Sequence, residues 1–283
     1  MAYHALKANG IMAALFSRLE WGCRMLLKDK VAIITGGGNG VGREAAVKFA
    51  KEGASVAVAA RTPALLDETV EMVKAAGGKA IAVPTEISVT EQVQNLIDTT
   101  IAEFGQIDVM VNNASYPGPW IELAEVPLEE WDYVQGTIVR GTMLCSKFCL
   151  PHMISRKSGN IIQVSSTAAR RGLALKVHYS TAKLALIGFT RGLAAEVGKY
   201  NIRTNCIVPG AVMTDRLERV FERAVEVDGV TYEEAQAGYT SNSPMNRIVA
   251  AGEVADLMIY LASDLSNGIH GQSIDINAGS HME

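Results

Sequence analysis

The sequence predicts an α/β fold, built as one doubly wound parallel sheet with helices on both faces. Short apolar runs alternate along the chain with stretches of helical composition, which is typical of a parallel sheet covered by helices. Glycines stand where several of these helices should end, at Gly53, Gly77, Gly78 and Gly105. With 283 residues and 48% apolar side chains the chain can bury one large core, so a single domain is expected.

The strands are predicted from their apolar, β-rich composition and from the turn residues around them. In chain order they are Val31 to Thr35, Ser55 to Ala60, Ala80 to Val83, Asp108 to Val111, Asn160 to Val164, Arg203 to Val208 and Gln272 to Ile276. Long apolar helices are expected from Pro127 to Ile154 and from Tyr179 to Tyr200.

Two further segments do not follow this alternation. Residues 1–26 precede the first strand and are expected to form an N-terminal extension of unknown role, so the folded unit is expected over residues 27–283. Residues 215–245 are rich in charge at first and contain Phe221, Tyr232 and Tyr239. We expect this second segment to form a small helical lid over a binding site.

A glycine-rich turn follows the first predicted strand. Residues 36–42 read Gly-Gly-Gly-Asn-Gly-Val-Gly, and residues 43–50 have helical composition. Glycine lets the backbone turn tightly and lets an anion approach the free N–H groups at the amino end of a helix. The spacing is Thr-Gly-x-x-x-Gly-x-Gly rather than the common fingerprint G-x-G-x-x-G. A flexible connector is the alternative, but directly after a buried strand the turn favours a site for dinucleotide phosphates.

A candidate catalytic group lies in the second half of the chain. Tyr179 and Lys183 are four residues apart in a helical stretch, so their side chains are expected on one helix face. Tyrosine has a pKa of about 10, and an adjacent ammonium stabilises the phenolate and lowers that pKa. Ser166 follows the predicted strand at residues 160–164, and open α/β sheets place ligand chemistry at the carboxyl ends of their strands. Ser166, Tyr179 and Lys183 are therefore predicted to form one site; ordinary core packing of the ring is the alternative.

Two more motifs accompany these residues. Residues 112–115 read Asn-Asn-Ala-Ser after a predicted strand, and residues 205–210 read Asn-Cys-Ile-Val-Pro-Gly and are followed by Thr214. Taken in this order with the glycine turn and the serine, tyrosine and lysine, the motifs resemble the short-chain dehydrogenase/reductase family over residues 27–279. The resemblance is to 3-oxoacyl-carrier-protein reductase-like members, and it is shared by many carbonyl reductases of other specificity.

The resemblance implies a Rossmann-like sheet, a nicotinamide dinucleotide cofactor and a small carbonyl or secondary alcohol substrate. In the reductive direction Tyr179 would give its proton to the carbonyl oxygen and Ser166 would hydrogen-bond the developing oxyanion, while Lys183 would hold the nicotinamide ribose and lower the pKa of the tyrosine. The implied cofactor-binding residues are Thr35, Gly36, Asn39, Gly40, Val41, Gly42, Arg61, Glu86, Ile87, Asn113, Ala114, Tyr179, Lys183, Pro209, Gly210, Val212 and Thr214.

The end of the second predicted strand bears on the choice of cofactor. NAD binders of this architecture usually place an acid there for the ribose 2′-hydroxyl, whereas a cation suits the 2′-phosphate of NADP. The sequence has Arg61 and no acid at this point. NADP(H) is therefore predicted as the cofactor, with NAD(H) as the alternative. Arg61 could also be an ordinary surface residue at the start of a helix, with no role in binding. Glu86 stands at the implied adenine site, where the family often has aspartate.

One position departs from the family pattern. Ile138 stands where the family usually has an asparagine that helps to hold a water joining the lysine to solvent. Its apolar stripe, typical of core packing, also contains Trp131, Val134, Cys145 and Cys149. We expect a backbone carbonyl to hold this water in place of the asparagine. Alternatively, Thr137 or Thr142 could take the place of the asparagine, or the relay could be weakened so that turnover is slow. A non-catalytic dinucleotide-binding sensor or scaffold is therefore the competing function.

Composition argues against several kinds of partner. The net charge is −4 and there is no block of Lys or Arg, so neither nucleic acid nor a membrane is expected as a partner. Four cysteines without a Cys-x-x-Cys pair indicate a reducing compartment, so a cytoplasmic location is expected. Five scattered histidines predict no metal site. The resemblance and the two long apolar helices imply a homotetramer.

The substrate itself is not identified by the sequence. The pocket is expected to be lined by residues 115–120, residues 168–171, His178 and the segment after Thr214. Tyr116 and Trp120 favour an apolar or ring-bearing substrate, with loop packing as an equal alternative. Arg170 and Arg171 are interpreted either as a site for an anionic group or as an exposed, solvated face.

Overall fold

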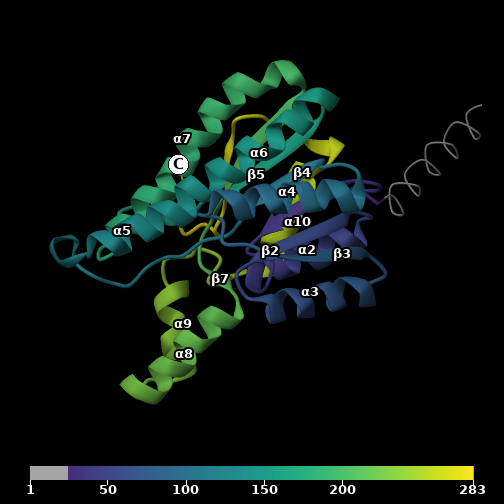
Figure 1. The fold of residues 1–283 in the computed structure, drawn as a ribbon. Helices are drawn as coiled ribbons and strands as arrows, with labels where there is room; N and C mark the ends of the chain where they lie inside the picture. Colours follow the sequence, from purple (N-terminus) through teal and green to yellow (C-terminus); the bar gives the residue numbers. More distant parts are fainter. Residues whose placement is uncertain (1–24, 283) are drawn as a thin grey trace, which may run out of the picture.

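The computed structural model describes residues 25–282, and its centre is a seven-stranded parallel sheet (Figure 1). The strands are β1 (Val31–Thr35), β2 (Ser55–Ala60), β3 (Lys79–Pro84), β4 (Val109–Asn112), β5 (Gly159–Val164), β6 (Ile202–Pro209) and β9 (Ser273–Ile276). Their order across the sheet is β3-β2-β1-β4-β5-β6-β9, and all neighbouring pairs are parallel. The predicted doubly wound sheet is confirmed. The predicted extension lies outside the described residues, apart from Met25 and Leu26.

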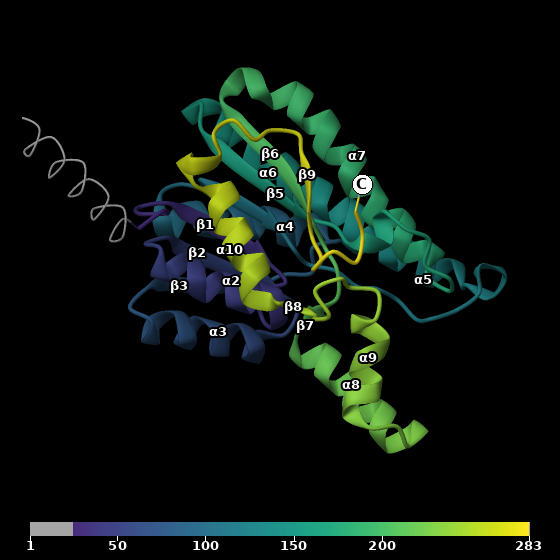
Figure 2. The same ribbon diagram turned by 180° about the vertical axis from the view of Figure 1, so that it is seen from behind.

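Helices cover both faces of this sheet, as the views from opposite sides show (Figures 1 and 2). One face carries α2 (Gly40–Lys51), α3 (Pro63–Ala75) and α10 (Ala251–Ala262), and the other carries α4 (Thr90–Phe104), α6 (Gly141–Arg156) and α7 (Val177–Val197). Each group buries its apolar side chains against the strands. Because both faces are covered, the central strands are largely apolar, and every residue of β1 is buried.

The long helix predicted from Pro127 to Ile154 is interrupted. It consists of α5 (Leu128–Gln135), a π-turn η2 (Gly136–Arg140) and α6. The Gly141 N–H donates to the Gly136 carbonyl five residues earlier, instead of the usual four. The prediction of one uninterrupted α-helix was wrong, because a spacing of apolar residues does not reveal a single wider turn.

A helical excursion extends from the body of the molecule beyond the carboxyl end of β6 (Figure 1). Its elements are β7 (Val212–Met213), α8 (Asp215–Asp228), α9 (Tyr232–Thr240) and β8 (Val249–Ala250), and β7 pairs with β8. The ring of Phe221 meets Tyr232 and Tyr239 edge to face, with centroids 5.5 and 5.3 Å apart. These aromatic contacts hold α8 against α9, and the helices predicted over residues 215–245 are present.

The order of the strands reverses beside β1. The chain runs from β1 outward to β2 and β3, and then returns to β4 on the other side of β1. In open α/β sheets ligands bind outside the carboxyl ends of the strands at such a point. The remaining short helices are η1 (Leu123–Glu125), η3 (Thr167–Ala169), η4 (Gly198–Tyr200) and η5 (Asp264–Ser266). Within residues 25–282, no helix has the length and apolar character needed to cross a membrane.

Candidate active site

The glycine turn brings backbone groups close together between β1 and α2. Gly36 has a φ of +66°, and a Cβ on it would lie 2.9 Å from Asn113 Nδ2. A Cβ on Gly42 would lie 2.1 Å from the Gly36 carbonyl oxygen, so neither position accepts a side chain. Helix α2 begins at Gly40, and its first N–H groups have no partner within the helix. The turn therefore offers the close backbone approach that a pyrophosphate needs.

Thr35 and Asn113 fasten this turn to the end of β4. The Thr35 hydroxyl donates to the Val111 carbonyl at 3.1 Å and accepts from the Asn113 and Ala114 N–H groups at 3.0 and 3.1 Å. The Asn113 side chain donates to the Thr35 carbonyl at 2.9 Å. Thr35 is buried, so it supports the turn from behind and does not line the groove as its place among the predicted cofactor residues suggested.

A groove of adjoining cavities runs along the carboxyl ends of the strands. Arg61 and Glu86 line one end, the glycine turn lines the middle, and Tyr179 and Lys183 line a catalytic cavity of about 420 Å³ at the other end. Ser115 borders all three cavities. The predicted residues that line the groove are Gly36, Asn39, Gly40, Val41, Gly42, Arg61, Glu86, Ile87, Asn113, Ala114, Ser166, Tyr179, Lys183, Pro209, Gly210, Val212 and Thr214.

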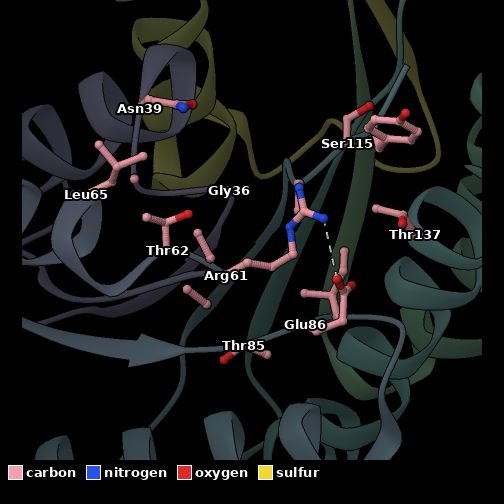
Figure 3. Close-up of a pocket in the computed structure, with 15 residues that line it drawn as sticks. Gly36, Asn39, Arg61, Thr62, Leu65, Thr85, Glu86, Ser115 and Thr137 are labelled. Carbon is pink, nitrogen blue, oxygen red and sulfur yellow. Dashed lines mark ion pairs between the residues drawn. The ribbon is translucent and has the colours of Figure 1, made fainter. Parts of the chain in front are cut away.

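Arg61 lies across the first of these cavities, opposite Glu86 (Figure 3). Its Nη1 is 3.8 Å from Glu86 Oε2 and donates a hydrogen bond to the Tyr133 hydroxyl. The arginine side chain is 59% exposed, so this ion pair is weak. The Thr137 hydroxyl lines the same cavity and is buried without a hydrogen-bond partner among the described residues. This end of the groove thus presents one cation, one carboxylate and one unused hydroxyl.

Ser166, Tyr179 and Lys183 meet in the catalytic cavity. Ser166 follows β5, and the other two lie one turn apart on α7. The Ser166 and Ser115 hydroxyls hydrogen-bond to the Tyr179 oxygen. Lys183 is 2% exposed, and its Nζ donates to the Val164 carbonyl at 2.8 Å and lies 5.7 Å from the centroid of the Tyr179 ring. The structure therefore brings together the three residues that the sequence analysis singled out.

Burial dominates the ionisation of this group. Burial raises the pKa of Tyr179 above its ordinary value, although the hydrogen bond from Ser166 and the charge of Arg216 act in the opposite direction. Burial also lowers the pKa of Lys183 to about 8. Burial, and not the charge of Lys183, is the largest effect on the pKa of Tyr179, and the lowering of that pKa by Lys183 stays a prediction. The ammonium is bonded to a backbone carbonyl, and desolvation of the phenolate is the larger effect.

Ile138 belongs to the core. It is fully buried in a cluster with Val134, Ala182 and Leu186, and the Tyr179 ring packs against that cluster. The π-turn η2 spans Ile138, so the departure from the family pattern coincides with a change in helical register. The Thr137 hydroxyl lines the end of the groove that is far from Lys183. This position does not favour Thr137 as a replacement for the asparagine.

Three expectations about the substrate pocket are wrong. His178 is fully buried and lines none of the cavities, because its ring packs behind Gly118. Tyr116 lines the cavity of Arg61 instead of the catalytic cavity, and its ring meets Tyr133 edge to face at 5.0 Å. Arg170 is neither a solvated residue nor a free anion site, since its buried side chain pairs with Asp275 at 3.2 Å.

The catalytic cavity contains one residue that the sequence reasoning missed, Lys176, and two that it expected only as lining of the pocket, Ser115 and Arg216. Ser115 bonds to the Tyr179 oxygen, and Lys176 and Arg216 line the cavity wall. The signal for Lys176 was weak: it precedes Tyr179 by three residues, but it is the N-cap of α7 and lies outside the helical repeat. Arg216 belongs to the segment after Thr214, which was expected to line the pocket. The role of Ser115 depends on a tertiary contact and had no such signal.

A glycine turn at the switch point of a parallel sheet, joined by one groove to a serine, a tyrosine and a lysine, defines a dinucleotide-dependent oxidoreductase of the open α/β type. The family model described as short chain dehydrogenase matches residues 30–224. The chain belongs to the short-chain dehydrogenase/reductase family, as the motifs indicated.

Relatives support the same assignment over nearly the whole chain. The chain is 31% identical over 255 residues to a 3-oxoacyl-[acyl-carrier-protein] reductase of Thermotoga maritima, covering 90% of this chain and 99% of the relative. It superposes on L-sorbose reductase of Gluconobacter frateurii, solved with NADPH and L-sorbose, with a TM-score of 0.87 and 28% identity, covering 91% of this chain and 98% of that one. A 7α-hydroxysteroid dehydrogenase, solved with NADH and 7-oxo glycochenodeoxycholic acid, superposes with a TM-score of 0.83 and 29% identity. The match covers 92% of this chain and 97% of that one.

Proposed function

We propose that this protein transfers a hydride between NADP(H) and a carbonyl or secondary alcohol, with Tyr179 as the acid and base. The observation that carries this proposal is the meeting of Ser166, Tyr179 and Lys183 in one cavity at the end of the dinucleotide groove. Membership of an oxidoreductase family supports it.

The groove has the features that such a cofactor needs. The glycine turn leaves no room for a Cβ at Gly36 or Gly42, so the backbone itself lines the middle of the groove. Arg61 offers a fork of donors for a 2′-phosphate, and the buried Thr137 hydroxyl is free to bond to a ligand. The cofactor would supply or accept the hydride. The protein supplies placement and proton transfer.

Each catalytic side chain has a distinct task in the reductive direction. Burial raises the pKa of Tyr179, so the phenol carries its proton at neutral pH and can give it to the carbonyl oxygen. Ser166 bonds to the phenol oxygen and lies where it can also bond to the oxygen of the substrate. Lys183, with a pKa of about 8, is mostly protonated at pH 7 and would hold the nicotinamide ribose. In the oxidative direction Tyr179 would first release its own proton, and the phenolate would then take the proton of the alcohol.

A backbone carbonyl of the π-turn is proposed to replace the asparagine of the family pattern. A wider turn disturbs the regular hydrogen-bond ladder of a helix, and such turns are frequent at functional sites. Ile138 lies within this turn and shares a cluster with the Tyr179 ring. The proton would then reach solvent through a water held by the backbone, with no side chain required at position 138.

NADP(H) is proposed over NAD(H) because Arg61 lines the cavity at the end of β2 and no acid occupies that strand end. One observation favours the alternative: Glu86 lies 3.8 Å from Arg61 and could accept hydrogen bonds from an unphosphorylated ribose. Relatives of similar structure were solved with NADPH and with NADH. The relatives therefore do not decide between NADP(H) and NAD(H), and the proposal depends on Arg61 and Glu86 of this chain.

The test is NADPH oxidation by the wild-type protein with a panel of aldehydes, ketones and oxo acids. Turnover of any member supports an enzyme, and the reverse reaction with the matching alcohol and NADP should follow. Tight binding of NADPH with no turnover across the panel would instead favour a dinucleotide sensor or scaffold.

The remaining proposals concern assembly, the lid and location. The outer sides of α5 and α7 expose large apolar side chains, including Leu128 and Leu184, which supports burial between subunits. Light scattering should give four chains of 30.3 kDa each for the proposed homotetramer. Helices α8 and α9 would act as the substrate lid, and the cytoplasm is the proposed location.

A further inference from the structure

The catalytic cavity is lined by cations and by no carboxylate. Among the residues that the structure describes, Lys176, Lys183 and Arg216 border this cavity, whereas no Asp or Glu does. An adjoining cavity, which shares Ser166 and Tyr179 with it, adds Arg171 and again has no acidic side chain. The chain as a whole contains more acidic than basic residues, 30 against 26. Composition therefore does not explain the excess of positive charge around Tyr179.

Lys176 is a buried ammonium without an anionic partner. Only 3% of it is exposed, and its Nζ donates to the backbone carbonyls of Pro117 and Gly118 and lies 4.8 Å from the centroid of the Trp120 ring. An ammonium has three donors, and these two carbonyls leave one available toward the cavity. A buried charge without a counter-ion is costly, which an anion entering the cavity would relieve.

Nearby Glu130 does not supply that counter-ion. Burial and the charge of Arg216 lower the pKa of Lys176 to about 8, and the attraction of Glu130 is the smallest of the three effects. Lys176 forms no ion pair with any residue from 25 to 282. Glu130 lies near Gly118, as does the ring of His178, and is absent from the cavity wall.

Arg216 approaches the same space from α8. Its side chain is exposed and has no hydrogen bond or ion pair to any described residue, although its charge acts on both Lys176 and Tyr179. Arg216 also borders the middle cavity, where the pyrophosphate is proposed to lie, whereas Arg219 borders that cavity without reaching the catalytic one. Lys176 borders the catalytic cavity but not the middle one.

We propose that the substrate is an anion, with its carbonyl at Tyr179 and a carboxylate or phosphate group bound between Lys176 and Arg216. This inference rests on the proposed function and names the substrate class for the same site. Lys176 supplies a fixed point charge on one wall, and Arg216 supplies a fork of donors from the lid. Trp120 and Leu173 line the space between, so the part that joins the two groups of the substrate is expected to be apolar.

The first experiment compares matched pairs of substrates with the NADPH-loaded enzyme. A series of 2-, 3-, 4- and 5-oxo acids is assayed against the methyl ester of each acid, and dihydroxyacetone phosphate is assayed against dihydroxyacetone. We expect the anion to have a kcat/KM at least tenfold above its neutral partner in one or more pairs, and the pair that responds identifies carboxylate or phosphate. Neutral compounds that are equal to or better than their anions in every pair would overturn the proposal.

Arg216→Gln tests the contact itself, since this exposed side chain can be changed without loss of packing. It should lower the ratio of kcat/KM for the preferred anion to kcat/KM for its neutral partner about tenfold. Arg223→Gln, on the same helix but outside these cavities, is the matched control and should leave that ratio unchanged. A rise in the Kd of NADPH with an unchanged ratio of anion to neutral substrate would assign Arg216 to the pyrophosphate and refute the proposal.

A binding measurement separates this inference from the proposed function. Calorimetry with the NADP-loaded protein should detect benzoate and give at least tenfold weaker binding for benzamide. The Kd of benzoate should rise as the pH passes about 8, where Lys176 and Lys183 in the same cavity lose their protons, and Glu130 and Arg216 are the other charged groups that act on Lys176. Benzoate binding without any turnover would reject the proposed function and keep the anion site, whereas equal binding of both probes would reject the anion site.

Discussion

The ammonium of Lys183 lies over the ring of Tyr179, 5.7 Å from its centroid, and is bonded to the Val164 carbonyl and not to the phenol oxygen. Burial lowers the pKa of this lysine to about 8. A lysine whose pKa is depressed in the folded state destabilises that state wherever it is protonated there. The role proposed for Lys183 in catalysis therefore comes at a cost in stability.

Lys183→Met should stabilise the protein at neutral pH. Removing the buried charge gains roughly 3 kcal/mol, reduced by about 1 kcal/mol for the lost hydrogen bond to Val164, so the melting temperature should rise by a few degrees. The destabilisation by the wild-type lysine is complete below pH 8, where the folded and unfolded chains are both protonated, and it fades as the pH rises toward the unfolded pKa of about 10.5. Melting curves of both proteins at pH 7 and pH 9.5 measure this difference.

The matched control for this prediction is Lys51→Met, because Lys51 is exposed at the end of α2. Its melting temperature should stay close to that of wild type at both pH values. A Lys183→Met protein that melts below wild type at pH 7 would mean that the bond to Val164 is worth more than the burial of the charge.

Arg61→Ala should weaken NADPH binding and leave NADH binding nearly unchanged. Loss of charge-assisted hydrogen bonds to a phosphate costs about 2 kcal/mol, which corresponds to a Kd roughly thirtyfold higher. Arg61→Lys keeps the charge without the fork of donors, so its Kd for NADPH should lie between those of wild type and Arg61→Ala. Fluorescence titration of the three proteins with each reduced cofactor gives six affinities, and wild-type protein that binds NADPH and NADH equally would end the argument for a phosphate site.

Glu86→Gln should act in the opposite direction. The carboxylate lies 3.8 Å from the Arg61 guanidinium and competes with a phosphate for it. Because the arginine of this pair is exposed, we expect the Kd of NADPH to fall by only about two- to fivefold. The Arg61→Ala/Glu86→Gln double variant is the control, since the effect of the glutamine should vanish without the arginine. A weaker affinity for NADPH in Glu86→Gln alone would show that Glu86 supports the cofactor.

Ile138→Asn should destabilise the protein without improving turnover. It places an amide among Val134, Ala182 and Leu186, and burying an unsatisfied polar group in place of an isoleucine costs roughly 2–4 kcal/mol. Ile138→Val, which removes one methylene, should cost about 1 kcal/mol and serves as the reference for packing. Melting temperature and kcat are measured together. A tenfold gain in kcat for the asparagine variant would mean that the side-chain relay is missing and that no carbonyl replaces it.

Most of the sheet could be predicted because its strands are buried on both faces. Runs such as Ser55 to Ala60 are continuously apolar between turn residues, so the observed β2 has the predicted bounds. Helix ends were predictable for a similar local reason: α4 ends at Gly105, whose φ of +79° suits glycine. The π-turn at Gly136–Arg140 could not be predicted, since it preserves the apolar stripe while changing the hydrogen bonds.

The site was predictable where its chemistry is local in sequence. The glycine turn and the spacing of Tyr179 and Lys183 are such local patterns. Contacts that depend on the fold escaped prediction. Nothing near Arg170 in the sequence indicates its pairing with Asp275, more than a hundred residues away. The balance of burial against charge that sets the pKa of Tyr179 likewise depends on everything packed around it.

The most direct test of the central claim is the turnover of Tyr179→Phe with NADPH and the best carbonyl substrate. The substitution removes only the phenol oxygen, so the account predicts that kcat falls by about 10²- to 10⁴-fold while the Kd of NADPH stays within twofold of wild type. A Tyr179→Phe protein that reduces the carbonyl at a rate near that of wild type would contradict it.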